Sequence, residues 1–162
     1  MKVKKKKREE FTYRKATLED ADDMQEIINY HARKEKMLSR SLSGLYEKVR
    51  EYTVCENSKG KVVGCCGLHI HWLDCAEIRA LAVRPHYMGR GIGSELVKMC
   101  VREAKRLKIP RVFTLTAAPE FFKKVGFKKV NKNKLPMKVW GDCLNCPKYL
   151  NCDEVALIRE LV

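Results

Sequence analysis

Three closely spaced glycines follow an apolar segment near the middle of the chain, in the run Met88-Gly89-Arg90-Gly91-Ile92-Gly93-Ser94. The apolar segment, residues 77–83, has the composition of a buried strand, and Pro85 ends it because proline has no N–H to donate. After the glycines, apolar residues recur at helical spacing as far as Leu107. Glycine permits backbone angles closed to other residues, and the start of a helix offers free N–H groups to an anion. The order of strand, glycine turn and helix therefore predicts an anion site that suits a pyrophosphate.

Two nucleotide-binding motifs are excluded by the residues around these glycines. A P-loop needs a Lys-Ser or Lys-Thr pair after its last glycine, and no such pair follows Gly93. A dinucleotide fingerprint needs a further glycine, but Ser94, Glu95 and Leu96 come next. The alternative that these residues leave open is a tight turn without a ligand.

Eight cysteines are many for a chain of this length, and the last three have a spacing that suits a metal. These three are Cys143, Cys146 and Cys152. The pattern C-x2-C-x5-C supplies thiolates, which zinc and iron–sulfur clusters prefer. Three ligands leave a tetrahedral site one short, and Cys75 or Asp153 could be the fourth. The sequence thus leaves two alternatives, a structural zinc or iron–sulfur site and a loop of packed, reduced thiols.

Other residues able to do chemistry lie in runs with a simpler explanation. Cys65, Cys66 and Cys100 fall within apolar segments and are interpreted as small core residues. His69 and His71 alternate along one face of a predicted strand and are interpreted as structural.

Composition and charge indicate one domain with a basic surface. A chain of 162 residues with 45% hydrophobic content suits a single core, and its formal net charge is +14. Residues 1–10 are expected to be a disordered basic tail, residues 11–162 the domain, and residues 141–153 its Cys-rich segment. The tail lacks interleaved aromatic residues for base stacking, so nucleic acid is not an expected partner. No run is long enough to span a membrane and no signal peptide is evident, so a cytoplasmic location is expected.

Hydrophobic periodicity and turn residues predict an alternation of strands and helices. The expected strands are 11–16, 52–56, 61–72, 77–83, 111–116, 127–130, 135–140 and 154–161, with 127–130 paired to 135–140. The expected helices begin at Thr17, span 45–50, follow the glycines, and span 120–125. In the central strand, Ile78, Ala80 and Ala82 are expected on one face and Leu81 and Val83 on the other.

The residues Leu81-Ala82-Val83 and Arg90-Gly91-Ile92-Gly93 resemble the acetyl-CoA signature of the GCN5-related N-acetyltransferases. One departure is Met88, which stands where the family has Gln or Arg. The resemblance covers nearly the whole chain and implies an α/β fold, with a mixed, mostly antiparallel central sheet and helices on both faces. It also implies acetyl-CoA as co-substrate, with backbone pairing between residues 81–83 and 114–116. The residues expected to bind it are Leu81, Ala82, Val83, Met88, Gly89, Arg90, Gly91, Ile92, Gly93 and Ser94.

The same resemblance implies direct attack of an amine on the thioester, for which the amine must first lose a proton. Glu77 stands where family members often place the general base, and a base there needs a pKa raised by desolvation. The alternative is an ion pair between Glu77 and Arg79 on the sheet surface. Phe122 replaces the tyrosine that usually returns a proton to the thiolate, so the general acid is unassigned.

Several segments resemble the small amino-acid N-acetyltransferases of the N-acetylglutamate synthase type. They are residues 37–42, 77–83 and 118–122, together with the Cys-rich ending. This implies acetylation of a small-molecule amine, glutamate above all, for arginine biosynthesis, with Arg40, Ser41 and Arg79 binding the acceptor. A homodimer is the other expected partner, and no membrane is expected. The alternatives are a protein or polyamine N-acetyltransferase, or a coenzyme-A-binding module without turnover.

Overall fold

The computed structural model describes residues 8–135 and 154–161, which form one seven-stranded sheet with the order β1-β2-β3-β4-β5-β7-β6. The strands are β1 (Thr12–Lys15), β2 (Tyr52–Glu56), β3 (Val62–Trp72), β4 (Cys75–Val83), β5 (Arg111–Thr116), β6 (Lys128–Lys129) and β7 (Val155–Glu160). The helices are α1 (Ala21–Arg33), α2 (Leu42–Glu47), α3 (Ile92–Arg106) and α4 (Pro119–Lys124). All pairings are antiparallel except that of β4 with β5, so the prediction of a mixed, mostly antiparallel sheet is confirmed.

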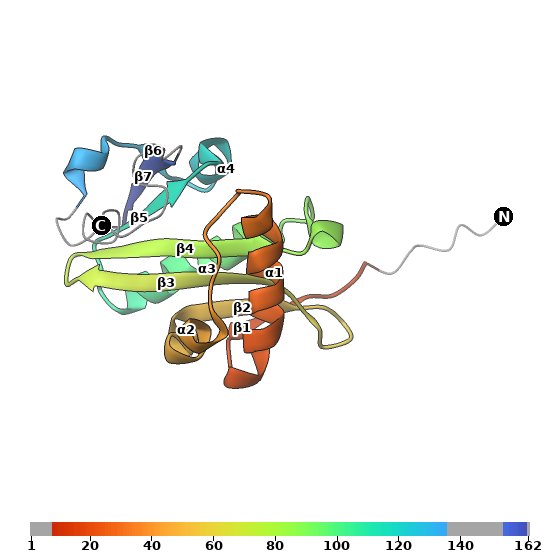
Figure 1. The fold of residues 1–162 in the computed structure, drawn as a ribbon. Helices are drawn as coiled ribbons and strands as arrows, with labels where there is room; N and C mark the ends of the chain where they lie inside the picture. Colours follow the sequence, from red (N-terminus) through yellow and green to blue (C-terminus); the bar gives the residue numbers. More distant parts are fainter. Residues whose placement is uncertain (1–7, 136–153, 162) are drawn as a thin grey trace.

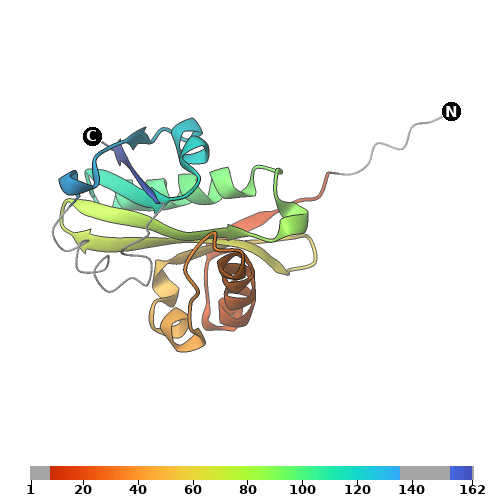
Figure 2. The same ribbon diagram turned by 45° about the horizontal axis from the view of Figure 1, so that its top comes forward.

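The helices cover both faces of this sheet (Figures 1 and 2). In Figure 2, α1 and α2 lie below the central strands, while α3 and α4 lie above them. The apolar stripe of α1, namely Ala21, Met24, Ile27 and Ile28, packs in one buried cluster with Leu45 of α2 and Val54 of β2. The apolar face of α3 forms the other main cluster, with residues of β3, β4 and β5. The sheet therefore has a hydrophobic core on each side.

A bulge in β4 changes which residues face which core. Cys65 pairs with Ala82 and Gly67 pairs with Arg79, so two residues of β4 lie opposite Cys66 alone. Ala80 has a positive φ of 52°, a conformation that non-glycine residues rarely adopt. As a result Ile78 faces α3, whereas Ala80 and Ala82 face α1. The prediction that these three residues share one face was wrong, because an extra residue reverses the alternation.

The observed elements differ from the predicted ones at several boundaries. Helix α2 begins three residues earlier than predicted, because Ser41 caps it by accepting a hydrogen bond from Gly44 N at 3.1 Å. A short 3-10 turn, Val49–Glu51, then leads into β2. Strand β6 pairs with β7 along one edge. The predicted pairing of residues 127–130 with 135–140 is not tested and stays a prediction. Residues 136–140 lie outside the described part of the chain. Among the described residues, no helix is long and apolar enough to cross a membrane.

Candidate active site

Strands β4 and β5 run together for only a short distance and then separate (Figure 1). Their parallel pairing joins Ala76 to Val112 and Glu77 to Phe113. Just beyond it, Thr114 Oγ1 donates a hydrogen bond of 3.0 Å to the carbonyl of Ile78. Residues 81–83 of β4 and 114–116 of β5 are not paired with each other, although each strand is paired on its other side. The two facing edges can therefore accept an extended ligand as an added strand.

One atom of the β4 edge already has a partner. His31, near the end of α1, donates from Nε2 to the carbonyl oxygen of Val83 at 2.7 Å. A carbonyl oxygen has two lone pairs, so Val83 keeps one site for a ligand. The end of α1 is thus tied to the strand that was predicted to bind the coenzyme.

The glycine turn lies between the end of β4 and α3, as the sequence indicated. Gly89 and Gly91 have φ values of 76° and 82°, and Gly91 is the N-cap residue of α3 without a side-chain cap. Gly93 differs, since it lies in the first turn of α3, where an added Cβ would come 3.4 Å from the Phe121 ring. The turn therefore presents the uncapped N–H groups of a 15-residue helix.

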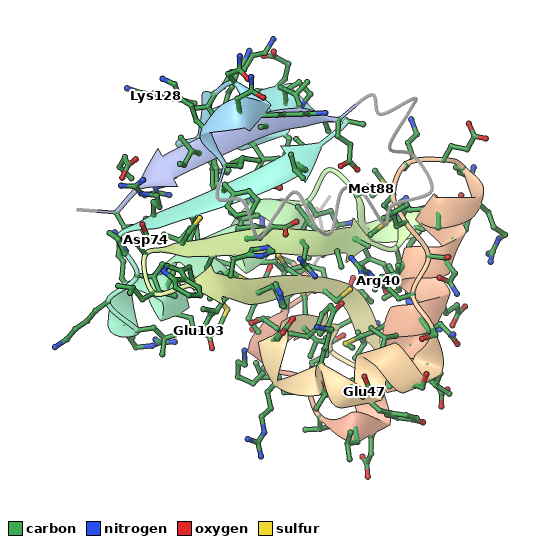
Figure 3. The ribbon with its side chains drawn as sticks, turned by 60° about the vertical axis from the view of Figure 1, so that its left-hand side comes forward. Arg40, Glu47, Asp74, Met88, Glu103 and Lys128 are labelled. Atoms are coloured by element: carbon green, nitrogen blue, oxygen red, sulfur yellow. The ribbon has the colours of Figure 1, made fainter. Side chains whose placement is uncertain are left out.

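The side chains of this turn are less involved than its backbone. Met88 is exposed, and Figure 3 shows it near the end of β4. Arg90 forms an ion pair of 3.1 Å with Glu9 and lies over the ring of Tyr87. A phosphate bound here would meet backbone N–H groups first, with Arg90 able to exchange Glu9 for it.

Glu77 lies in a compact hydrogen-bonded cluster on the side of the sheet that faces α1 and α2. Its Oε1 is 2.8 Å from His71 Nε2 and 2.7 Å from Arg79 Nη2. Burial alone would raise the pKa of Glu77, but the hydrogen bonds from His71 and Arg79 outweigh it, so the pKa lies below its usual value. The raised pKa expected for a general base is therefore not what the structure has. Glu77 is ionised at neutral pH and can accept a proton without losing one first.

A cavity of about 210 Å³ adjoins this cluster. Its lining consists of Ser39, Arg40, Ser41, Gly44, Leu45, Lys48, Tyr52 and Arg79. It brings together all three residues predicted to bind the acceptor, from the segment between α1 and α2 and from β4. Figure 3 shows Arg40 where that segment crosses the central strands. Lys48 and Tyr52 were not predicted as site residues, and burial raises the pKa of Tyr52 to about 12.

Arg40 is the cavity residue best placed to bind a ligand. Its backbone is fixed at both ends, since its N–H donates to Asn29 Oδ1 and its carbonyl accepts from Gln25 Nε2. Its Nε is buried and has no hydrogen-bond partner among the described residues. A buried donor without a partner is costly, so an anion that accepted from Arg40 would relieve that cost. Ser41, in contrast, already uses its hydroxyl to cap α2.

The residue at the usual general-acid position is part of the core. Phe122 is buried and packs edge-on against Phe121 and Phe127, at ring-centroid distances of 5.1 and 5.4 Å. It has no proton to donate, and its role is to hold α4 against the sheet.

The cysteines divide as the sequence suggested, as far as the described residues extend. Cys65, Cys66 and Cys100 are buried, and burial raises the pKa of the Cys65 thiol to about 12. Cys75, a possible fourth metal ligand, is buried too. The three predicted ligands, Cys143, Cys146 and Cys152, lie outside the described residues. Within the described part, no group of three or more His, Cys, Asp or Glu side chains could hold a metal ion. The metal site stays a prediction.

An open strand edge, a glycine turn with uncapped N–H groups and an ionised carboxylate have the chemistry that a long anionic donor and an amine acceptor require. The acetyltransferase (GNAT) family model matches residues 14–127. An uncharacterized N-acetyltransferase of Chlorobaculum tepidum is 38% identical over 91% of this chain and 95% of its own length. An amino-acid acetyltransferase of Mycobacterium tuberculosis is 37% identical over 84% of this chain and 78% of its own length.

Solved structures agree with these relatives. A Mycobacterium tuberculosis protein in complex with CoA and a second ligand has a TM-score of 0.80 and 30% identity, over 93% of this chain and 99% of that one. N-acetylglutamate synthase from Neisseria gonorrhoeae, complexed with coenzyme A and N-acetyl-glutamate, has a TM-score of 0.86 and 26% identity. That match covers 96% of this chain and 36% of the synthase chain. The chain belongs to the GNAT acetyltransferase family. It is an acetyl-CoA-dependent N-acetyltransferase.

Proposed function

We propose that this enzyme acetylates the α-amino group of glutamate, as a step of arginine biosynthesis. The observation that carries the proposal is the cavity where Arg40, Lys48 and Arg79 meet. Three cationic side chains around about 210 Å³ suit an acceptor with carboxylate groups and repel a polyamine. The names of the relatives support the same class, since one is an amino-acid acetyltransferase and another is an N-acetylglutamate synthase.

Arg40 is proposed to hold a carboxylate of the acceptor. Its guanidinium can grip a carboxylate with two parallel hydrogen bonds, which a lysine cannot do. The unpartnered Nε supports this role, because a ligand carboxylate would supply the missing acceptor. Arg79 links the cavity to Glu77, since it lines the former and donates to the latter. The acceptor's amine is therefore expected to lie within reach of the Glu77 carboxylate.

The coenzyme is proposed to lie along the open edge of β4, with its pyrophosphate at the glycine turn. The residues present fit such a ligand, because the turn offers uncapped N–H groups beside two left-handed glycines. Leu81, Ala82 and Val83 supply the backbone groups for an extended arm. When bound, acetyl-CoA supplies the activated acetyl group.

The chain's own residues then have two tasks in the reaction. Glu77 accepts a proton from the acceptor's ammonium group, so that the nitrogen lone pair becomes free to attack. The bulge leaves Ala80 and Leu81 without a partner in the β3–β4 ladder. A backbone N–H of this bulge is suited to stabilise the negative charge that would develop on the thioester's carbonyl oxygen. The nitrogen would form its new bond to the carbonyl carbon, and the C–S bond would break as the carbonyl re-forms. The nitrogen would release its second proton to solvent, and the thiolate would take a proton from solvent because Phe122 has none to give.

The test is acetyl transfer from acetyl-CoA to a panel of glutamate, glutamine, aspartate, lysine, spermidine and a peptide with a free N-terminus, with products identified by mass spectrometry. Acetylglutamate is the expected main product. The Arg40→Gln variant is expected to raise the KM for glutamate about 10- to 100-fold, because it removes charged hydrogen bonds worth about 1.5–3 kcal/mol. Arg33→Gln is the matched control, since Arg33 is exposed on α1 and does not line the cavity. Product only on amines without a carboxylate would contradict the proposal.

A further inference from the structure

His71 is a buried histidine whose imidazole contacts Glu77. Its side chain is 1% exposed, and its Nε2 lies 2.8 Å from Glu77 Oε1. We propose that His71 is a positioning residue for the base: it fixes one oxygen of Glu77 so that the other faces the acceptor amine. This inference rests on the proposed function, in which Glu77 takes the amine's proton.

The hydrogen-bond pattern assigns the proton of this imidazole. An ionised carboxylate can only accept hydrogen bonds, so Nε2 of His71 must carry the hydrogen. Arg79 Nη2 donates to the same oxygen at 2.7 Å. Both donors therefore bind Oε1, and Oε2 accepts no hydrogen bond from the described residues. The geometry leaves one oxygen of Glu77 for the substrate.

The imidazole of His71 is itself held from several directions. The register of β3 shifts between Ile70 and Trp72, where His71 is the extra residue. Such a bulge re-aims a side chain, here toward Glu77 on the neighbouring strand. The ring packs edge-on against His69 at 4.7 Å and lies 5.4 Å from the ring of Phe113. A ring fixed in this way can hold the carboxylate in one orientation.

A second histidine–carboxylate hydrogen bond stabilises this arrangement. His69 Nδ1 is 2.8 Å from Glu51 Oε1, which fixes the ring that packs against His71. Among the described residues, the titratable or charged groups that interact with Glu77 are His71 of β3 and Arg79 and Cys75 of β4. Glu51 of the 3-10 turn and Tyr52 of β2 interact with Arg79, and Arg111 of β5 interacts with Cys75. Of these, His71 and Arg79 act directly on Glu77.

Loss of His71 therefore has a predictable effect on the pH dependence. Without its donor, burial is opposed by Arg79 alone, and the pKa of Glu77 rises. The acidic limb of kcat/KM reports the base of the free enzyme, so this limb moves to higher pH. A residue that only filled space would leave the limb where it is.

The experiment compares His71→Leu, His71→Gln and Glu77→Gln in the full chain. His71→Leu is expected to lower kcat at least about tenfold, with the KM values for glutamate and acetyl-CoA changed less than about twofold. His71→Gln keeps an N–H donor and is expected to recover most of the rate and of the pH profile. Adding His71→Leu to Glu77→Gln is expected to lower kcat little further than Glu77→Gln alone, since the two residues act as one unit.

A second measurement does not need turnover. The Glu77 carboxylate is followed by carbon NMR during a pH titration of the wild type and of both His71 variants, with the folded state checked by circular dichroism. A higher pKa of Glu77 in His71→Leu, with the wild-type pKa restored in His71→Gln, supports the proposal. A titration unchanged in His71→Leu overturns it. If His71→Leu keeps the wild-type rate while Glu77→Gln is inactive, the positioning role of His71 is wrong and Glu77 remains the proposed base. If Glu77→Gln keeps the full rate, the assignment of Glu77 as the base is wrong.

Discussion

The glycine turn gives the sharpest prediction, because the chain contains a matched pair of left-handed glycines. Gly91 has φ of 82° at the start of α3, and Gly60 has φ of 76° in the turn between β2 and β3. A Cβ added at either position would meet nothing within 4 Å. The cost of Gly91→Ala or Gly60→Ala to folding is therefore the left-handed backbone alone, about 1–2 kcal/mol.

The two variants are expected to have equal stability but different coenzyme affinity. For a domain of this size, that cost lowers the melting temperature by about 2–8 °C in both. Only Gly91→Ala places a methyl group where a pyrophosphate would approach the N–H groups of α3. Loss of one charged hydrogen bond there corresponds to about 1.5–3 kcal/mol, or at least a tenfold higher Kd for coenzyme A.

The assay pairs thermal unfolding, followed by circular dichroism, with titration calorimetry of coenzyme A in one buffer at fixed salt. Equal coenzyme affinity of Gly91→Ala and the wild type would refute the location of the anion site. A loss of affinity in Gly60→Ala would refute the argument that the effect is local.

Two further predictions concern stability. Phe122→Ala is expected to lower the free energy of unfolding by about 3–5 kcal/mol, measured by urea denaturation, because it empties an aromatic cluster in the core. Burial alone would raise the pKa of Asp20, but hydrogen bonds from Arg14 and Thr17 hold that pKa below its usual value. The contribution of Asp20 to the free energy of unfolding is therefore fully present above the pKa of the unfolded state, about 3.9. The stability difference between the wild type and Asp20→Asn should thus be constant from pH 7 to 5 and shrink as the pH falls through the folded pKa. A difference that grows toward acid pH would show that the sign is wrong.

The sequence predicted the order of elements well, because strong local signals mark their ends. Pro85 and the glycines separate β4 from α3, and Ile109-Pro110 separates α3 from β5. The faces of β4 could not be predicted in the same way. Its bulge lies at Ala80, an alanine with the backbone angle of a glycine, and nothing in the residue type indicates this.

The site was predictable where backbone conformation or family resemblance specified it. Arg40, Ser41 and Arg79 do line one cavity, but Lys48 and Tyr52 were missed because they follow a helix whose end was misplaced. The contact between His71 and Glu77 joins two strands across a hairpin. Alternation along β3 alone could indicate only that His69 and His71 share a face. Whether a carboxylate has a raised or lowered pKa depends on such contacts, so the sequence could not give its direction.

The brief pairing of β4 with β5 has a mechanical consequence. Within the described residues, two residue pairs are the only sheet ladder between the unit β1–β4 and the unit formed by β5, β6 and β7. A ligand that hydrogen-bonds to both edges would act as a removable strand that closes the sheet. We expect amide hydrogen exchange at Leu81, Val83 and Leu115 to slow when coenzyme A binds, while exchange in the β2–β3 ladder stays constant. The donor substrate would then hold together the two halves of the molecule that carry out its own reaction.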